Sequence, residues 1–289
     1  MPAQGSSKMS ASALAVGVII SVFLPAVSSA ATPLFPAPLH LTRQVQDPIS
    51  GSTAVLNEYA YGNRLISVRG GKTSIADYEK GQLIEIDREG GTYSITRFDE
   101  LAKAAQFIGQ TGRGAGVAAQ DAPKAVTAPR HPLRAIGAKL TAAGRAAEFF
   151  QGDVENATAT QVIEVGVDRS VLLSRDALEV LVGAAYPGVL SAEHEVVLAA
   201  AASPRRSLET AAQAEERSYA LPIEQVTRVD LDGRQLEFRT SITRIGNEPP
   251  PADLIAVPAG ARLVLSRIVA VQRELEQLDH PAAVVPRSP

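Results

Sequence analysis

Between Leu39 and Phe98 the sequence alternates apolar and polar residues in short runs, and glycines interrupt these runs at regular intervals. A period of two is the pattern of a half-buried β-strand. The glycines fall where tight hairpins require a positive φ angle. We therefore expect an antiparallel meander of five or six strands. The expected strands cover Leu39 to Val45, Thr53 to Tyr61, Arg64 to Arg69, Lys72 to Tyr78, Gln82 to Asp87 and Thr92 to Phe98.

A short helix is expected after the meander, because Asp99 is a good N-cap and the residues from Leu101 to Ile108 form an apolar stripe. From about 109 to 134 the chain is rich in Gly, Ala, Pro and Gln without periodicity. Such a composition cannot bury enough apolar area to offset the entropy lost on ordering. This range is predicted to be a flexible linker.

The second half of the sequence predicts strands, then helices, then a hairpin. The strands are expected at Ile136 to Thr141, Ala147 to Gln151, Ala157 to Val165 and Asp168 to Leu173. The helices are expected at Arg175 to Val182 after Ser174, at Ala192 to Ala202 after Ser191, and at Leu208 to Arg217. We interpret about 174–217 as a helical insertion. Asp232-Gly233 indicates a hairpin between the strands Tyr219 to Val229 and Arg234 to Ile245, which complete the sheet.

The first thirty residues are typical of a secretory signal. A polar start with Lys8 precedes an uncharged apolar run from Leu14 to Leu24, which is too short to cross a hydrocarbon core of about 30 Å as a helix. Ser28 and Ala30 suit cleavage before Ala31. The sequence therefore predicts export to the periplasm or the medium. An uncleaved N-terminal membrane anchor is the alternative, and a cytosolic protein fits less well.

Composition narrows the classes of partner. The formal net charge is −3, and removing residues 1–30 changes it to −4 because Lys8 is the only charged residue lost. Nucleic acids and anionic membrane surfaces select for a basic face, which neither this balance nor any Lys/Arg run supplies. The chain has no cysteine, so disulfides and a lipid-bearing cysteine are excluded. With 45% apolar residues, the remaining chain can be held by a hydrophobic core.

Two groups of segments carry a resemblance to known proteins. The first is Ser74 to Tyr78, Gln82 to Asp87 and Thr92 to Thr96; the second is Leu221 to Ile223, Asp230 to Glu237, Ser241 to Thr243 and Val257 to Gly260. They resemble an uncharacterised family of exported bacterial proteins of unknown function, whose expected fold is the half-barrel of the periplasmic lipoprotein carriers. The helical region from Arg175 to Arg217 departs from the family pattern.

The resemblance implies an α+β fold, in which a curved antiparallel β-sheet forms a lipoprotein-carrier-like half-barrel with helices packed on one face. In the carriers this shape holds acyl chains, although similarity of fold does not transfer activity. The expected organisation is a signal peptide at 1–30, a single β-rich domain at 31–262, and a C-terminal amphipathic helix and tail at 263–289.

The sequence points to no catalytic, cofactor-binding or metal-ligating residue. The four histidines, His40, His131, His194 and His280, are scattered along the chain. His194-Glu195 resembles the start of a zinc-protease helix, but Leu198 stands where the second histidine belongs. No nucleophile elbow is present. We interpret the carboxylate pairs, including Glu193 with Glu195, as helix-start or solvent-facing groups.

The C-terminal segment is the most suggestive feature. Val264, Ile268, Val271, Leu275 and Leu278 recur at spacings of four and three, the pattern of an amphipathic helix. Such a helix could dock on its own sheet or contact a partner chain. The range from Arg262 to Val271 is also β-branched enough to form a strand.

From these observations we expect a non-enzymatic binding or carrier module for an apolar ligand or a protein segment, with no cofactor. An envelope structural or interaction protein that uses the C-terminal helix is the alternative. An exported hydrolase with an unrecognised site is a third possibility, which the absence of a clustered acid, histidine or nucleophile disfavours.

Overall fold

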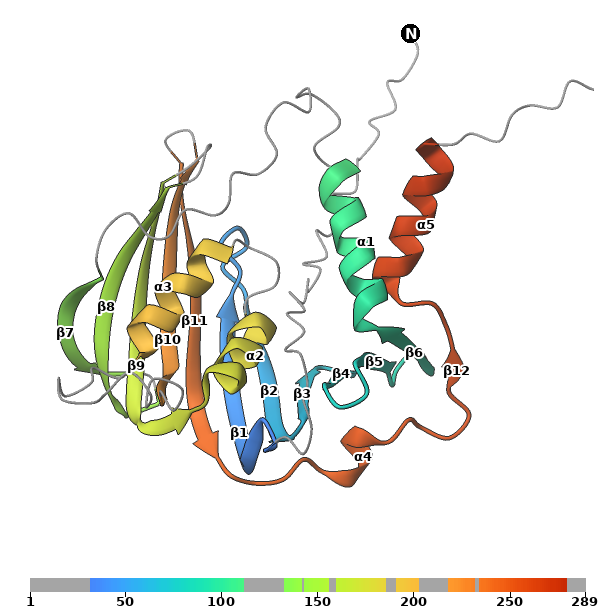
Figure 1. Ribbon diagram of the computed structural model, residues 1–289, viewed down its shortest axis with the longest axis horizontal. Coiled ribbons are helices and arrows are strands. Elements are labelled where there is room, and N and C mark those ends of the chain that lie inside the picture. The colour runs from blue at the N-terminus through green and yellow to red at the C-terminus, as the bar shows by residue number, and fades with distance from the viewer. Residues whose placement is uncertain are drawn as a thin grey trace, which may run out of the picture.

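The computed structural model describes residues 32–111, 133–141, 143–155, 160–185, 191–202, 218–231 and 234–279. One open, curved, twelve-stranded sheet carries helices (Figure 1), in the order β12-β6-β5-β4-β3-β2-β1-β11-β10-β9-β8-β7. The strands of the first half are β1 (Phe35–Gln46), β2 (Thr53–Gly62), β3 (Arg64–Arg69), β4 (Lys72–Asp77), β5 (Gln82–Asp87) and β6 (Thr92–Arg97). Those of the second half are β7 (Arg134–Leu140), β8 (Ala146–Glu155), β9 (Thr160–Leu173), β10 (Tyr219–Leu231), β11 (Arg234–Gly246) and β12 (Arg262–Leu263). The broad expectation of an α+β fold with a curved sheet is confirmed.

The predicted meander is confirmed strand by strand. Each strand from β1 to β6 pairs antiparallel with the next, in the register that the glycine turns impose. Gly70, Gly81 and Gly91 have φ angles of 58°, 62° and 60°, a region that residues with a Cβ atom rarely adopt. The short turns leave no room for a change of strand order, so the chain folds into neighbouring hairpins.

The two halves of the sheet meet at β1 and β11. β1 pairs antiparallel with β2 on one side and with β11 on the other, so the first strand lies near the middle of the sheet. β11 follows β10 through the predicted hairpin, in which Leu231 pairs with Arg234. Residues 232–233 themselves, like the predicted linker residues 112–132, lie outside the described ranges.

One predicted strand boundary is wrong. Within the described residues, the part of the first range from Thr160 onward and the range Asp168 to Leu173 form a single strand, β9, and not two strands. β9 stays paired with β10 because register shifts occur between Ala220 and Leu221 and between Pro222 and Glu224. These irregularities absorb the break that the sequence pattern indicated.

Five helices occur in the described ranges: α1 (Phe98–Thr111), α2 (Arg175–Ala185), α3 (Ser191–Ala201), α4 (Ala252–Ile255) and α5 (Arg267–Asp279). The predicted helices after Asp99, Ser174 and Ser191 are confirmed, and Ser174 Oγ accepts a hydrogen bond from the backbone N–H of Ala177 at 3.2 Å. The helix predicted at Leu208 to Arg217 lies outside the described ranges. None of the helices described is long and apolar enough to cross a membrane.

The main hydrophobic core lies between the sheet and two helices. Leu41, Leu65 and Leu83 of the first half pack in one cluster with Leu101 of α1 and Leu181 of α2. A second cluster joins α2 and α3 to β8, β9 and β10. A smaller cluster of isoleucines, Ile66, Ile75 and Ile86, occupies the opposite face of β3 to β5.

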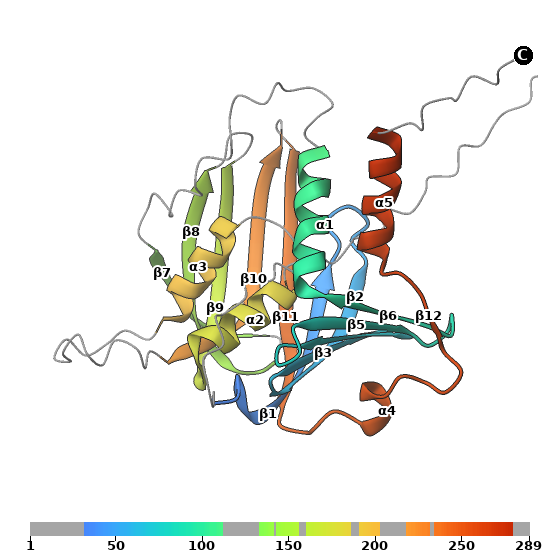
Figure 2. The ribbon, with the colours of Figure 1, turned by 45° about the vertical axis from the view of Figure 1, so that its right-hand side comes forward.

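The C-terminal segment wraps around the β3 to β6 part of the sheet. α4 lies on one side of these strands, while α1 and α5 lie on the other (Figure 2). Between α4 and α5, β12 adds a two-residue parallel pairing to the edge of β6. The sequence of the C-terminal segment allowed both a helix and a strand, and each expectation is partly right. Arg262 and Leu263 form a strand, and the helix begins only at Arg267. The helix α5 packs on α1 of its own chain.

Candidate functional site

A buried ion pair lies on the face of the sheet that α1 covers. Strand alternation places Arg43 on the same face as Leu41, and Glu58 on the same face as Ala60, and both apolar residues belong to the main core. Arg43 is 3% exposed and Glu58 is fully buried. Arg43 Nε donates to Glu58 Oε2 at 2.8 Å across the β1–β2 pairing. A charged pair therefore occupies a strand face on which the next positions along the same two strands, Leu41 and Ala60, are apolar.

The second carboxylate oxygen of Glu58 is not satisfied within the described part of the chain. Glu58 Oε1 is buried and has no hydrogen-bond partner there. A buried acceptor without a partner is costly, and a buried carboxylate normally accepts several hydrogen bonds. This oxygen is therefore the first atom at which a bound molecule could add an interaction.

Polar side chains continue across β11 and β10 on the same face. The sheet register places Thr240 opposite Val45 of β1 and opposite Gln225 of β10. Gln225 Nε2 donates to Thr227 Oγ1 at 3.1 Å. Gln225 Oε1 is buried and, like Glu58 Oε1, has no partner among the residues described. The five buried residues Glu58, Arg43, Thr240, Gln225 and Thr227 are hereafter called the polar stripe.

Apolar residues border the polar stripe. Ile242 lies opposite Arg43, and Val165 and Ile163 lie opposite Gln225 and Thr227. All three are buried. The polar stripe is therefore bordered by buried hydrocarbon.

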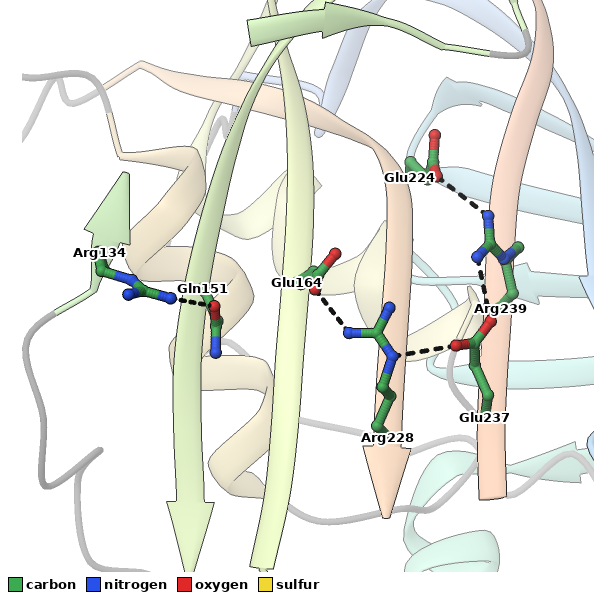
Figure 3. Close-up of polar contacts among 7 residues, drawn as sticks. All are labelled: Arg134, Gln151, Glu164, Glu224, Arg228, Glu237 and Arg239. Atoms are coloured by element: carbon green, nitrogen blue, oxygen red, sulfur yellow. Dashed lines mark hydrogen bonds and ion pairs between the residues drawn. The ribbon is translucent and has the colours of Figure 1, made fainter. Parts of the chain in front are cut away.

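The outer face of the same strands is different. Arg228 bonds to Glu164 at 2.6 Å and to Glu237 at 3.0 Å, and Arg239 bonds to Glu237 at 3.0 Å and to Glu224 at 3.6 Å (Figure 3). Toward the β7 edge of the sheet, Arg134 Nη2 of β7 donates to Gln151 Oε1 of β8 at 2.7 Å. These charges are partly exposed and paired with each other, and such pairs contribute about 0–1 kcal/mol each. The outer face thus shows a solvated charge network, in contrast to the polar stripe.

The polar stripe is not predicted from the sequence, although one signal is present. In β1 the apolar residues Leu39, Leu41 and Val45 share one face of the strand, and Arg43 has the same parity. An arginine in the apolar register of a strand requires a buried partner. Local sequence patterns do not identify that partner, because Glu58 is fifteen residues away and is opposite Leu41 only once the hairpin register is known.

The predicted solvent exposure of Glu193 is wrong. Glu193 is 6% exposed, because it lies on the inward line of α3 with Val197 and Ala200, which are both buried. Burial raises the pKa of Glu193 to about 7. The other member of the pair, Glu195, is exposed as expected. The sequence signal for this burial was the i, i+4 spacing of Glu193 and Val197.

The two described histidines are far apart in the fold. His40 in β1 stacks on Tyr59, with ring centroids 4.2 Å apart, and its Nδ1 lies 3.2 Å from Glu248 Oε2. His194 is in α3, where burial lowers its pKa. His131 and His280 lie outside the described ranges. Within those ranges no group of three His, Cys, Asp or Glu residues could hold a metal ion.

Comparison with known proteins adds little. No protein-family model matches the chain, and no curated protein matches it. Among solved structures, the chain is similar to PNGF-II with a TM-score of 0.34 and 6% sequence identity, covering 82% of this chain and 33% of that chain. The chain thus spans about a third of the length of PNGF-II, and a likeness this weak indicates neither fold nor activity.

Proposed function

We propose that this chain is an exported, non-enzymatic binding or carrier module that holds an apolar ligand against the helix-covered face of its sheet. The observation that carries the proposal is the polar stripe. Glu58 Oε1 and Gln225 Oε1 are buried acceptors within an apolar surround and have no partner among the described residues. Unsatisfied buried polar atoms are rare in folded proteins, and a bound molecule is one way to satisfy them.

The positions of the helices support this proposal. α2 and α3 pack over β8, β9 and β10, whereas α1 packs beside α5 and against β6. In the sheet order, β11, β1 and β2 lie between the strands that α3 covers and the strand β6 that α1 contacts (Figure 1). Leu41 of β1 and Ile242 of β11 pack in the main core with side chains of both α1 and α2. Most of the polar stripe is on these strands. We further propose that the curved sheet acts as a half-barrel, in which the ligand lies between the two helical groups.

Binding can be tested with the chain purified without residues 1–30. Native mass spectrometry and organic extraction should recover a co-purified apolar molecule, or the emptied protein should bind a fluorescent acyl probe. A matched control is Glu164→Gln, which alters a partly exposed charge on the outer face and should leave binding unchanged. Recovery of an empty protein with no affinity for acyl probes would contradict the proposal.

Export is the second part of the proposal and has its own test. The apolar run from Leu14 to Leu24 supports a cleavable signal with cleavage before Ala31. We expect N-terminal sequencing of the protein from the periplasm or the medium to begin at Ala31. Recovery of intact chain in the membrane fraction would instead support an uncleaved anchor.

One observation favours a second candidate, an envelope protein that contacts a partner through its C-terminal segment. Leu263, Val264 and Leu265 are 64%, 41% and 53% exposed, so three consecutive apolar side chains face solvent just before α5. A chain lacking residues 262–289 should then lose a self-association or partner contact seen by size-exclusion chromatography with light scattering. A monomeric full-length chain would count against this candidate.

A further inference from the structure

We infer that α3 is a pH-sensitive cover of the sheet, which is seated on β8, β9 and β10 in mildly acidic solution and lifts from them in mildly alkaline solution. The switch residue is Glu193 in the first turn of α3. Lifting α3 uncovers the second hydrophobic cluster, which this helix shares with α2 and the three strands. The switch requires no bound ligand, so it does not depend on the proposed function.

The seat of α3 is close to the sheet because a glycine lies beneath the helix. A Cβ atom at Gly152 of β8 would lie 3.0 Å from Val196 Cγ1 of α3. Val196, Val197 and Ala200 are buried in the second cluster. An isolated helix of 11 residues is marginal in water, so α3 depends on this contact. A free-energy cost at the contact therefore acts on α3 before it acts on the rest of the fold.

The carboxyl group of Glu193 is buried in this contact without a compensating charge. Glu193 is 6% exposed, and it forms no ion pair with any residue that the structure describes. A carboxylate is far more costly to remove from water without a partner than a neutral carboxyl group. Burial accordingly raises the pKa of Glu193 to about 7. The seated helix favours the protonated side chain, and lifting the helix returns the carboxylate to water.

The charged groups around the switch residue do not supply the missing charge. On α3 itself, burial lowers the pKa of His194 and so favours its neutral form, and Glu195 is exposed. From α2, Arg175 and Glu179 pair with each other at 2.8 Å. In the described part of the cluster, β8 and β9 contribute apolar side chains, and the titratable side chain from β10 is Tyr219.

His194 acts in the opposite sense to Glu193. Because its pKa is lowered, His194 opposes seating as the pH falls below its ordinary value of 6.5. Glu193 opposes seating as the pH rises from 4.5 toward 7. The pKa shift of Glu193 is the larger of the two. The balance therefore loosens α3 as the pH rises.

Amide hydrogen exchange of the full chain at pH 5 and pH 8, corrected for intrinsic exchange rates, tests the switch. We expect the protection of α3 amides to fall about tenfold or more between these values, while that of β3 to β5 amides changes less than about twofold. In Glu193→Gln the protection of α3 should not fall, since only the opposing His194 remains. In His194→Gln it should fall further than in the unmodified chain.

Gly152→Ala is the matched variant that does not titrate. Its Cβ atom would press on Val196, so the protection of α3 should be lower by a similar factor at both pH values. Equal pH-dependent losses in α3 and in β3 to β5 would overturn the inference, and so would α3 protection that is independent of pH. Both comparisons need only the unmodified chain, so they remain decisive if a variant does not fold. A Glu193→Gln variant that keeps the full loss would exclude Glu193 as the switch.

Discussion

Arg43 and Glu58 form a buried ion pair between adjacent strands, with Arg43 Nε 2.8 Å from Glu58 Oε2. The pair lies in the same layer as the leucines of the main core. Removing two ions from water costs several kcal/mol, and only good geometry offsets this cost. Such a pair is a weak source of stability.

The first prediction concerns the loss of one partner. Glu58→Gln removes the negative charge that faces Arg43 Nε inside the protein, so the free energy of unfolding should fall by about 3–5 kcal/mol. Urea denaturation measures this change. The control Glu164→Gln, at a partly exposed pair, should cost about 0–1 kcal/mol. The double variant Arg43→Met, Glu58→Leu should recover most of the loss. Equal costs at the two sites would show that burial of the pair has no energetic consequence.

The second prediction concerns pH and Glu193, whose burial raises its pKa from 4.5 to about 7. Between these values the folded chain keeps a proton that the unfolded chain has lost, so the contribution of Glu193 to stability is largest below about pH 4.5 and is lost as pH rises toward 7. The loss from this group is about 3 kcal/mol, at 1.36 kcal/mol per pKa unit.

Glu193→Gln should remove this component of the pH dependence. The measurement is the urea midpoint at pH 5 and at pH 8 for both proteins. Glu195→Gln is the control, because Glu195 is exposed on the same helix. A pH profile of Glu193→Gln that is parallel to that of the unmodified chain would contradict the prediction.

The third prediction concerns close packing at Gly166 of β9. A Cβ atom at this position would lie 2.6 Å from Phe149 Cζ, well inside contact distance. Gly166→Ala should therefore lower the thermal midpoint through overpacking of about 1–3 kcal/mol.

Phe149→Leu should restore part of that loss in the double variant, since it removes the clashing ring atoms. Gly90→Ala is the control, because its Cβ would meet only the end of the flexible Asp87 side chain at 3.1 Å. A purely additive double variant would show that the ring is not the obstacle.

The fourth prediction concerns the anchoring of α5. Ile268 packs against the main core from the first turn of this helix. Ile268→Ala should cost about 1–2 kcal/mol in a urea titration, since the side chain is only partly buried. Val264→Ala, at a side chain 41% exposed, should cost less than about 0.5 kcal/mol. If Ile268→Ala is equally mild, α5 does not depend on this contact.

The meander could be predicted closely because its determinants are local. Glycines with positive φ angles fix each turn, and alternation fixes which side chains face the core. The break expected between Val165 and Asp168 was wrong because the long-range pairing of β9 with β10 keeps the strand continuous through two register shifts. Glu193 was misplaced for a related reason, since only the packing of α3 on the sheet decides which of its faces is inward.

The sequence by itself determined the antiparallel hairpins of β1 to β6, the hairpin of β10 and β11, and the presence of helices beginning within one residue of the predicted positions near Asp99, Ser174 and Ser191. These depend on residues within a few positions of each other. Only the tertiary structure decided that β1 joins β11, that the C-terminal segment wraps around to place α5 on α1, and that Arg43, Glu58 and Gln225 share one buried face. Contacts between residues up to about two hundred positions apart depend on sheet order and packing, which local sequence patterns do not encode.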